Sequence, residues 1–373
     1  MRDTEAKATR EGGWRPVARV DLARIARNAL RLKAAAGGRG LLAVVKANAY
    51  GHGAVAVARA LEAAEVAGFC VATLAEGLEL RRAGVRAPIQ LLLGLDPADL
   101  PEAAAAGLDL TVVSAAHLQA LSPGLAHHPA GLHLEVETGI GRSGILRADL
   151  GGCLATLRAL GPQVKGAMTH FACAEDDDAF TAGQRRAFQE ALATLRQGGV
   201  APAMVHQAAS AACLRGALDG DTHVRCGIAL YGLCQVPEAA AFEPALELAA
   251  PVARVARIPA GTPVGYGATW RAPGPTTLAT LACGYADGFP RALANRAMAG
   301  FQGGLHPVVG RISMDLTTVA LPADARVQPG DEVVLLGRNP GDPHSVARTA
   351  DLLGTITYEV TCGLNRRVAR IPV

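Results

Sequence analysis

The sequence predicts a two-domain α/β protein, an N-terminal (β/α)8 TIM barrel followed by a C-terminal β-rich domain. From about residue 20 to 235, eight short apolar runs alternate with Ala/Leu/Arg-rich amphipathic segments, which is the pattern that a (β/α)8 barrel requires. After about residue 240 the pattern changes to period-two alternation and Pro/Gly turns. We therefore expect a barrel over residues 1–240 and a β-strand domain over residues 241–373.

The apolar runs are the expected barrel strands. They are 41–45, 69–72, 89–93, 110–113, 132–136, 165–169, 204–207 and 223–230, and helix-like stretches such as Ala54–Ala67, Ala115–Leu121 and Thr181–Gln197 lie between them. A doubly wound open sheet is the competing fold, but it usually has fewer strands, and no GxGxxG sequence opens the first helix. We expect about the first 15 residues to be flexible, and the early segment to pack on the C-terminal domain.

The C-terminal part is expected to be built from strands. Residues Val252–Ile258 alternate with period two, and further β-like runs follow at 276–283, 307–320 and 332–336, separated by Pro/Gly turns. No long amphipathic helix is evident in this part of the sequence. We therefore interpret it as a separate β-rich domain.

Composition narrows the class of protein. Half of the 373 residues are apolar and 18% are charged, so a sizeable core is available. A net charge of +3 without a basic cluster argues against a nucleic-acid surface. The polar N-terminus and the lack of long apolar runs indicate a cytoplasmic protein without a secretory signal or membrane span. The eight cysteines show no CxxC or CxxH spacing, so we expect reduced thiols and no metal.

Lys46 directly follows the first predicted strand. Five apolar residues, 41–45, precede the lysine, and a Gly-broken polar loop follows it. Because burial disfavours the charged form of an amine, a lysine in a confined site is a candidate for Schiff-base chemistry with an aldehyde. A lysine at a strand end can equally extend its ammonium group to the surface, and the local pattern leaves both interpretations open.

Polar residues also follow other predicted strands, and we expect them to meet at one end of the barrel, where catalytic groups of this fold collect. They are Lys46 after the first run, Glu135, Glu137 and Arg142 at the fifth, His170 at the sixth, His206 and Ser210 at the seventh, and Arg225 and Gly227 at the eighth. Each alone is also consistent with a buried histidine, a helix cap or an interior ion pair. Their convergence favours an active site.

The loops after the last two strands are the usual phosphate site of such barrels. Ser210 at a helix start offers a hydroxyl and nearby N–H groups, and Gly227 allows the backbone to approach closely. A phosphate-bearing cofactor together with an aldehyde-reactive lysine indicates pyridoxal 5'-phosphate.

The segment 44–53, which contains Lys46 and Tyr50, closely resembles the cofactor-lysine motif of alanine racemases. The resemblance covers nearly the whole chain from about residue 16. It continues in the family's order through Thr138–Arg142, Thr169–Ala172, Val224–Ile228, Gly265–Thr269, Gly284–Gly288, Gly310–Asp315 and Ile356–Val360. The resemblance implies a pyridoxal phosphate enzyme that interconverts L- and D-alanine and supplies D-alanine for peptidoglycan.

The resemblance also implies a role for each matched residue. Lys46 would hold the cofactor and act as the base on the face of D-alanine, and Tyr266 would be the base for L-alanine on the opposite face. In this family that tyrosine reaches the site of the partner subunit, which implies a homodimer with shared active sites. The other implied contacts are the cofactor phosphate with Tyr50, Ser210, Gly227, Ile228 and Tyr358, the rest of the cofactor with Arg142, His170 and Arg225, and the substrate carboxylate with Arg142 and Met314. We expect four further residues to support these contacts, Glu135, His206, Tyr285 and Asp315.

Proton transfer that inverts a stereocentre needs one base on each face, and each must act as the acid in the reverse direction. Lysine and tyrosine have free pKa values near about 10, so both must be shifted or coupled. For Tyr266 we hypothesise a hydrogen-bond chain through His206 to Arg225, whose charge favours the phenolate. An always cationic Arg225 at the pyridine nitrogen opposes protonation of that nitrogen and so limits side reactions.

The chain departs from the family pattern near the expected site. Glu135 stands where many members carry a lysine, often carbamylated, that presents a negative charge to the arginine corresponding to Arg142. We predict that Glu135 replaces that charge, either directly or through a bridging water, and the alternative is a strand residue without a catalytic part. Ala209 stands where asparagine is often found, which removes a polar contact near the cofactor, and Cys226 replaces a bulky apolar residue.

Three other functions are consistent with parts of this pattern. One is a racemase of the same build that acts on serine or on many amino acids, and the lack of a signal segment argues against the exported broad-scope kind. A second is a non-catalytic pyridoxal phosphate carrier, which the second domain with Tyr266 disfavours. A third is a pyridoxal phosphate decarboxylase, which Arg225 disfavours. We therefore expect an alanine racemase.

Overall fold

A computed structural model describes residues 14–373. The chain divides into two compact units. One consists of residues 25–242, and the other of residues 243–373 together with the described residues up to Arg24. The expected flexibility of about the first 15 residues falls almost wholly on residues 1–13, which lie outside the described chain.

Residues 25–242 form a nearly closed barrel of eight parallel strands, which confirms the predicted fold class. The strands pair in the order β10-β2-β3-β4-β5-β6-β8-β9. Where the two end strands meet, the backbone N–H of Thr222 donates to the carbonyl of Val205 (2.8 Å). The strands are β2 (Gly40–Val44), β3 (Gly68–Val71), β4 (Ile89–Leu91), β5 (Leu108–Val112), β6 (Leu132–Glu137), β8 (Val164–Met168), β9 (Met204–His206) and β10 (His223–Cys226), with a short β7 (Ile145–Leu146) beside the end of β6.

Each predicted run overlaps with one of these strands, but the last run is only partly a strand. The sequence predicts a strand over 223–230, whereas β10 ends at Cys226 and a 3-10 turn covers Ile228–Tyr231. The hydroxyl oxygen of Ser210 accepts the N–H groups of Gly227 (3.1 Å) and Ala229 (3.3 Å). Because these donors bond to a side chain, the strand ladder cannot continue.

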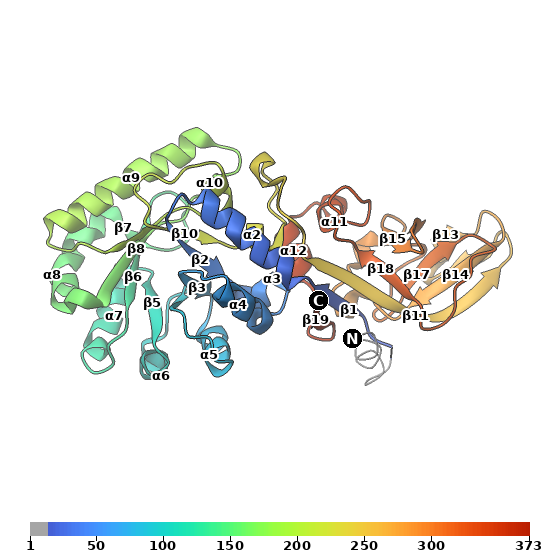
Figure 1. The fold of residues 1–373 in the computed structure, drawn as a ribbon, viewed down its shortest axis with the longest axis horizontal. Helices are drawn as coiled ribbons and strands as arrows, with labels where there is room; N and C mark the ends of the chain where they lie inside the picture. The colour runs from blue at the N-terminus through green and yellow to red at the C-terminus, as the bar shows by residue number, and fades with distance from the viewer. Residues whose placement is uncertain (1–13) are drawn as a thin grey trace. The chain divides into compact units, whose positions relative to one another are not determined.

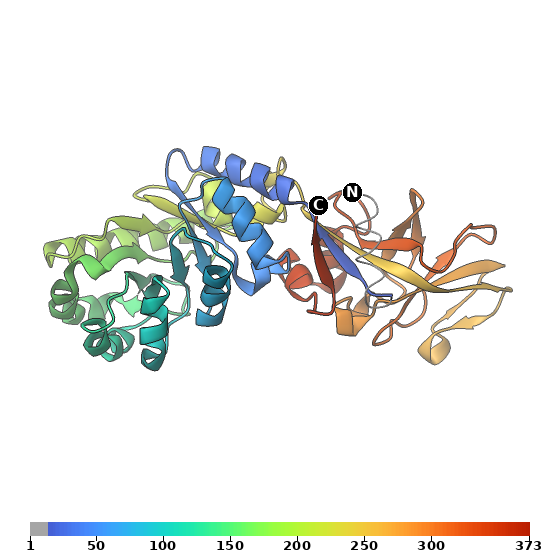
Figure 2. The same ribbon diagram turned by 60° about the horizontal axis from the view of Figure 1, so that its bottom comes forward.

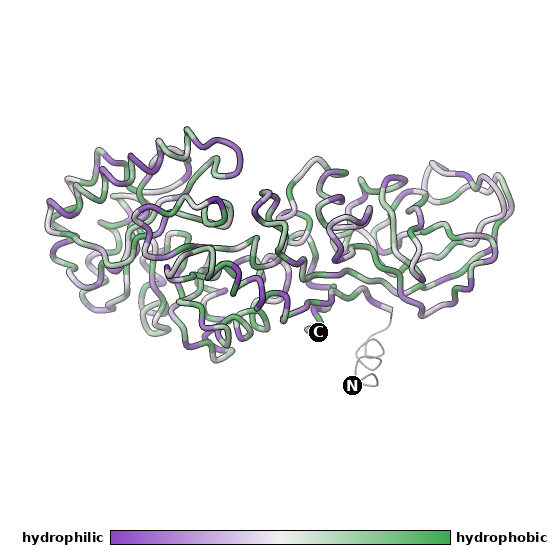
Figure 3. Tube along the Cα trace, turned by 45° about the horizontal axis from the view of Figure 1, so that its top comes forward, coloured by the Kyte–Doolittle hydropathy of each residue, from purple (hydrophilic) through white to green (hydrophobic). Residues whose placement is uncertain are grey.

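Helices cover the outside of the barrel strands (Figures 1 and 2). They are α2 (Leu22–Ala35), α4 (Ala54–Ala63), α5 (Leu74–Arg82), α6 (Leu100–Ala105), α7 (Ala115–Leu125), α8 (Leu150–Leu160) and α9 (Asp178–Gln197), and the short α3 (Lys46–Tyr50) and α10 (Ser210–Leu214) follow β2 and β9. Val57, Ala58 and Leu61 of α4 are fully buried, as the inward stripe of an amphipathic helix must be. In Figure 3, hydrophilic and hydrophobic residues accordingly alternate along these helices.

The second unit is β-rich, as predicted. One path of its sheet is β16-β15-β18-β11-β1-β19, and β14 joins β11 and β17. Its strands are β1 (Val17–Val20), β11 (Leu246–Ile258), β14 (Thr276–Leu281), β15 (Met298–Phe301), β16 (Gly304–Pro307), β17 (Thr317–Leu321), β18 (Glu332–Leu336) and β19 (Ala369–Pro372), with a separate hairpin of β12 (Pro263–Val264) and β13 (Trp270–Arg271). Two short helices are α11 (Val346–Leu353) and α12 (Thr357–Cys362).

The long strand β11 organises this sheet. Its first half pairs antiparallel with β1 and β18, and its second half pairs with β14. The sequence predicts one β run over 307–320, but β16 ends at Pro307 and β17 begins at Thr317. Between them Gly310 has a φ of 70°, and a Cβ there would lie 2.8 Å from the carbonyl oxygen of Val264. The chain therefore bends at this glycine instead of continuing as a strand.

Across residues 14–373, none of the helices has the length and apolar character that crossing a membrane requires.

Candidate active site

Lys46 begins a turn of the rare left-handed helix at the end of β2. Ala47, Asn48, Ala49 and Tyr50 all have φ between 52° and 54°. For residues other than glycine this conformation costs about 1–2 kcal/mol each. Four such residues in succession persist only where their surroundings hold them, and such places are often functional.

Two side-chain hydrogen bonds tie this turn to neighbouring helices. The carboxylate of Glu76, on α5, accepts the backbone N–H of Ala47 (2.7 Å) and also that of Ala72 (2.7 Å) after β3. The side-chain oxygen of Asn48 accepts the N–H of Ala54 at the start of α4 (2.8 Å). The direction in which Lys46 leaves the barrel is therefore fixed by two neighbouring helices.

Arg225, on β10, is 3% exposed and is held by several acceptors. One terminal nitrogen donates to Nδ1 of His206 (2.8 Å) and to its carbonyl, and the other donates to the carbonyls of Thr169 (2.7 Å) and Gln207 (3.3 Å) and to Nδ1 of His170 (3.2 Å). The Nε–H group finds no acceptor among residues 14–373. This N–H is a donor that the described chain leaves unused, and an aromatic ring nitrogen can accept from it.

An anion cradle lies where β10 ends. Ser210 and Gly227 are joined by the hydrogen bond described above, and the Tyr50 ring lies so close that a Cβ on Gly227 would be 2.5 Å from its hydroxyl oxygen. Only glycine therefore fits at position 227. The backbone N–H of Ile228 has no acceptor within the described chain. Hydroxyls and backbone N–H groups in one place suit a phosphate.

The loop after β6 is shaped by Glu137. Its carboxylate accepts the backbone N–H groups of Gly139, Gly141 (2.9 Å) and Arg142 (3.2 Å). Burial alone would raise the pKa of Glu137, but these backbone hydrogen bonds lower it below its ordinary value. The charged carboxylate thus fixes the backbone that carries Arg142.

Glu135 lies on the same strand and is 2% exposed. Its carboxylate accepts a hydrogen bond from the hydroxyl of Ser143 (2.8 Å). No direct hydrogen bond or ion pair joins it to the Arg142 side chain in the part of the chain that the structure describes. The predicted replacement of a carbamate therefore does not take the form of a direct contact.

The structure contradicts the hypothesis of a chain from Tyr266 through His206. Both ring nitrogens of His206 are already engaged: Nδ1 lies 2.8 Å from a nitrogen of Arg225, and Nε2 lies 2.9 Å from Nδ1 of His133. The ring is fully buried, so neither nitrogen is left for a phenol. The sequence predicted His206 near the site, but it did not show that the His206 ring bonds to residues on other strands.

His170 has a different environment. Burial and the charges of Arg225, Arg142 and Lys46 lower the pKa of His170 to about 3. The ring is therefore neutral near pH 7. The charges of Arg225, Arg142 and Lys46, which come from three different strand ends, therefore all act on His170.

The remaining predicted residues belong to the second unit. Tyr266 is 72% exposed, Met314 53% and Tyr285 43%. Asp315 is paired with Arg367 (2.7 Å), and Tyr358 lies on α12. The backbone N–H of Tyr285 donates to the carbonyl of Ser313 (3.1 Å), so Tyr285 and Met314 lie on adjoining loops. The structure thus divides the predicted site residues between two units.

The barrel residues fit pyridoxal 5'-phosphate. The phosphate suits the cradle around Ser210, and the pyridine nitrogen suits the unused Nε–H of Arg225. Lys46 is the amine that can bind its aldehyde. Within the described residues, no group of three or more His, Cys, Asp and Glu side chains is arranged to bind a metal ion.

Sequence reasoning missed several supporting residues. Glu76 had a usable signal, because Thr73 and Glu76 form the S/T-x-x-E pattern that caps α5. Asp109 and His133 had no such signal, since a polar residue within an apolar run does not show which strands its partners occupy.

The chain matches two protein-family models over almost its entire length. Residues 20–235 match the model "Alanine racemase, N-terminal domain", and residues 245–372 match "Alanine racemase, C-terminal domain". Alanine racemase of Cutibacterium acnes is 40% identical over 363 residues, which are 94% of this chain and 96% of the relative. Alanine racemase of Symbiobacterium thermophilum is 39% identical over 96% of this chain and 97% of the relative.

Solved structures agree with these matches. Alanine racemase from the D-cycloserine producer Streptomyces lavendulae superposes with a TM-score of 0.90 at 34% identity, covering 97% of each chain. Alanine racemase from Bartonella henselae with covalently bound pyridoxal phosphate superposes with a TM-score of 0.85 at 30% identity, covering 97% of this chain and all of that one.

Proposed function

Because the chain belongs to the alanine racemase family and is an alanine racemase by activity, we propose that it works by a two-base mechanism with pyridoxal 5'-phosphate. The observation that carries the cofactor assignment is the unused Nε–H of the buried Arg225 beside the cradle of Ser210 and Gly227. When bound, the cofactor withdraws electrons from the substrate's Cα and so makes its proton removable.

The bases are Lys46 and Tyr266. Lys46 exchanges the Cα proton on the face of D-alanine, and Tyr266 does so on the opposite face. The left-handed turn supports this role of Lys46, because an amine on a fixed backbone is positioned before the substrate arrives.

We place Tyr266 in the site of a partner subunit. Its 72% exposure supports this assignment, because a catalytic phenol on the surface of its own chain needs another surface to work on. For the support of the phenol we replace His206 by His170, whose Nδ1 faces Arg225 and whose Nε2 bonds to no residue of the described chain. Because Nδ1 of His170 accepts from Arg225, the proton of the neutral ring sits on Nε2, which can donate a hydrogen bond to the phenolate oxygen of Tyr266.

Substrate binding is assigned to Arg142 and to the backbone of Met314, which hold the alanine carboxylate. Tyr358 joins Tyr50, Ser210, Gly227 and Ile228 at the phosphate, while Tyr285 and Asp315 support the loops of the second unit. Glu135 remains our candidate for the missing carbamate charge, acting across the Ser143 hydroxyl or a water molecule. The D-alanine produced would serve peptidoglycan synthesis in the cytoplasm.

The proposed division of labour is tested by mixing subunits. Lys46→Ala and Tyr266→Phe are each nearly inactive alone, but in a heterodimer one site has both bases. Random mixing makes half of the dimers heterodimers with one good site of two, so about one quarter of wild-type activity should return. No recovery, with dimer exchange verified by mass spectrometry, would mean that Tyr266 serves its own barrel.

Substrate choice needs a separate experiment. Purified wild type is incubated with L-alanine, L-serine and L-lysine, with and without added pyridoxal phosphate, and the enantiomers are separated on a chiral column. We expect alanine to be racemised fastest and only with the cofactor. Faster conversion of serine would assign the enzyme to the same fold with a different substrate.

A further inference from the structure

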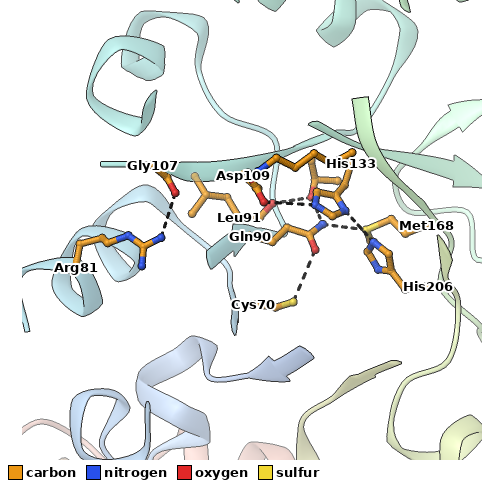
Figure 4. Close-up of polar contacts among 11 residues, drawn as sticks. Cys70, Arg81, Gln90, Leu91, Gly107, Asp109, His133, Met168 and His206 are labelled. Carbon is orange, nitrogen blue, oxygen red and sulfur yellow. Dashed lines mark hydrogen bonds and ion pairs between the residues drawn. The ribbon is translucent and has the colours of Figure 1, made fainter. Parts of the chain in front are cut away.

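A row of buried polar side chains lies in the barrel interior, and Figure 4 shows three of its members, His206, His133 and Asp109. Nδ1 of His206 lies 2.8 Å from a guanidinium nitrogen of Arg225, and Nε2 of His206 lies 2.9 Å from Nδ1 of His133. Nε2 of His133 in turn lies 3.8 Å from a carboxylate oxygen of Asp109, a polar contact longer than a hydrogen bond. The row thus begins at a guanidinium and ends at a carboxylate.

Only one placement of protons satisfies this row. Arginine has no acceptor, so Nδ1 of His206 must accept and the His206 proton must sit on Nε2. That proton points at Nδ1 of His133, which must also accept, so the His133 proton sits on Nε2 and faces Asp109. Both histidines are therefore neutral, and every donor in the row points away from Arg225 and toward Asp109.

The carboxylate at the far end remains charged. Burial alone would raise the pKa of Asp109, but His133 and Lys165 lower it below its ordinary value. Lys165 contacts the other carboxylate oxygen (2.7 Å) and is 48% exposed, whereas Asp109 is 8% exposed. Asp109 therefore supplies a buried negative charge that orients the His133 ring.

Two glycines leave the space that the row occupies. A Cβ on Gly166 would lie 2.2 Å from Nδ1 of His133, and a Cβ on Gly131 would lie 2.2 Å from a carboxylate oxygen of Asp109. Neither glycine has a positive φ, so their backbones do not require glycine. The packing requires it, because a side chain at either position would displace a member of the row.

We propose that Asp109 and His133 are positioning residues for Arg225. They act through His206, whose tautomer they fix so that its Nδ1 always accepts from the guanidinium. The inference rests on the proposed function, in which Arg225 meets the pyridine nitrogen of the cofactor. A guanidinium with both terminal nitrogens held keeps its Nε–H in one direction, toward that nitrogen.

The tautomers can be read on the wild-type chain without cofactor. With ¹⁵N-labelled histidine, the ring nitrogens of His133 and His206 should both show the neutral Nε2–H form from pH 6 to 8. Resonances are assigned from variants that lack each ring. A charged ring, or an Nδ1–H form of either histidine, would overturn the proposal whatever the enzyme's activity.

Variants then test the effect on the cofactor. His133→Leu removes the acceptor of His206, whereas His133→Asn keeps a side-chain oxygen near the position of Nδ1. We expect His133→Leu to raise the dissociation constant of pyridoxal phosphate and to lower kcat about tenfold each, with the KM for alanine unchanged, and His133→Asn to restore most of both. Equal losses in the two variants would contradict the proposal.

Two further variants test the proposal if His133→Leu does not fold. Gly166→Ala displaces the His133 ring while keeping every polar group, so it should weaken cofactor binding and shift the His206 ring resonances. Gln90→Leu is the matched control, because Gln90 is buried in the same interior and bonds to Thr111 (2.9 Å) outside the row. Gln90→Leu should leave the His206 ring resonances unchanged. If it shifts them as much as Gly166→Ala does, the effect of Gly166→Ala is a general packing effect and the proposal is wrong.

Discussion

The barrel and the β-rich unit hold their candidate residues in opposite ways. In the barrel, Arg225 and His206 are buried and each is held by several partners, so their side chains have one arrangement. In the β-rich unit, Tyr266 and Met314 are more than half exposed. The barrel therefore presents a preorganised site, whereas the other unit presents a surface that works only against something else.

The largest expected difference concerns the two bases. Lys46→Ala should lower kcat in both directions by about 10⁴-fold, and Tyr266→Phe by about 10³-fold, because each removes one proton-transfer group. Tyr266→Phe should leave the free energy of unfolding within about 0.5 kcal/mol of wild type, since the hydroxyl is on an exposed side chain. Chiral assays and urea unfolding check both statements. A strongly destabilised Tyr266→Phe variant would contradict the proposed difference between the buried residues of the barrel and the exposed residues of the β-rich unit.

The left-handed turn gives the next largest effect. Glu76→Ala removes a charged acceptor of the Ala47 N–H and should lower the free energy of unfolding by about 2 kcal/mol. Turnover should also fall, about tenfold, because Lys46 loses its fixed backbone. Glu79→Ala, on the same helix, is the control and should behave like wild type. If both variants behave alike, the turn does not depend on Glu76.

Acid should destabilise the barrel through His170, which is partly buried. The pKa of His170 is about 3 in the folded state, below its ordinary value of 6.5. Below pH 6.5 this histidine therefore binds a proton in the unfolded chain but not in the folded chain. As the pH decreases, the free energy of unfolding falls by up to about 1.4 kcal/mol per pH unit until pH approaches 3. His170→Gln should show a smaller decrease in urea unfolding between pH 7 and 5. Parallel pH profiles would contradict this.

Glu135 gives the smallest expected effect. Glu135→Gln keeps the hydrogen bond with Ser143 but removes the charge, so the KM for alanine should rise about threefold with little change in kcat. Ser143→Ala removes only the hydrogen bond and serves as the comparison. Unchanged kinetics of Glu135→Gln would make this residue a strand residue without a part in substrate binding.

Periodicity predicted the barrel well because its strands are continuous apolar runs that few other structures produce. Periodicity predicted strands that are too long in two places. At Gly227 the hydroxyl of Ser210 takes the backbone hydrogen bond in place of a neighbouring strand, and at Gly310 a glycine bends an apolar stretch. Both failures come from contacts with distant residues. Such contacts leave no local trace in the chain.

The site was predicted less completely than the fold. Barrel topology was enough to bring Lys46, His170 and Arg225 together, because Lys46 and His170 follow parallel strands and Arg225 lies near the end of a third. It could not show that His206 bonds to His133 instead of facing the substrate, since strand position does not fix the direction of a ring. It also could not show where the surface around Tyr266 acts.

The left-handed turn has a consequence for the order of folding. Ala47 and Glu76 are 29 residues apart, so the strained backbone gains its carboxylate partner only after α5 has docked beside β2. We expect the turn to be absent from the transition state, with φ-values near zero at Ala47 and Asn48. Substitutions that relieve the backbone strain of the turn should then slow unfolding without speeding refolding. The barrel therefore forms before the turn that positions Lys46.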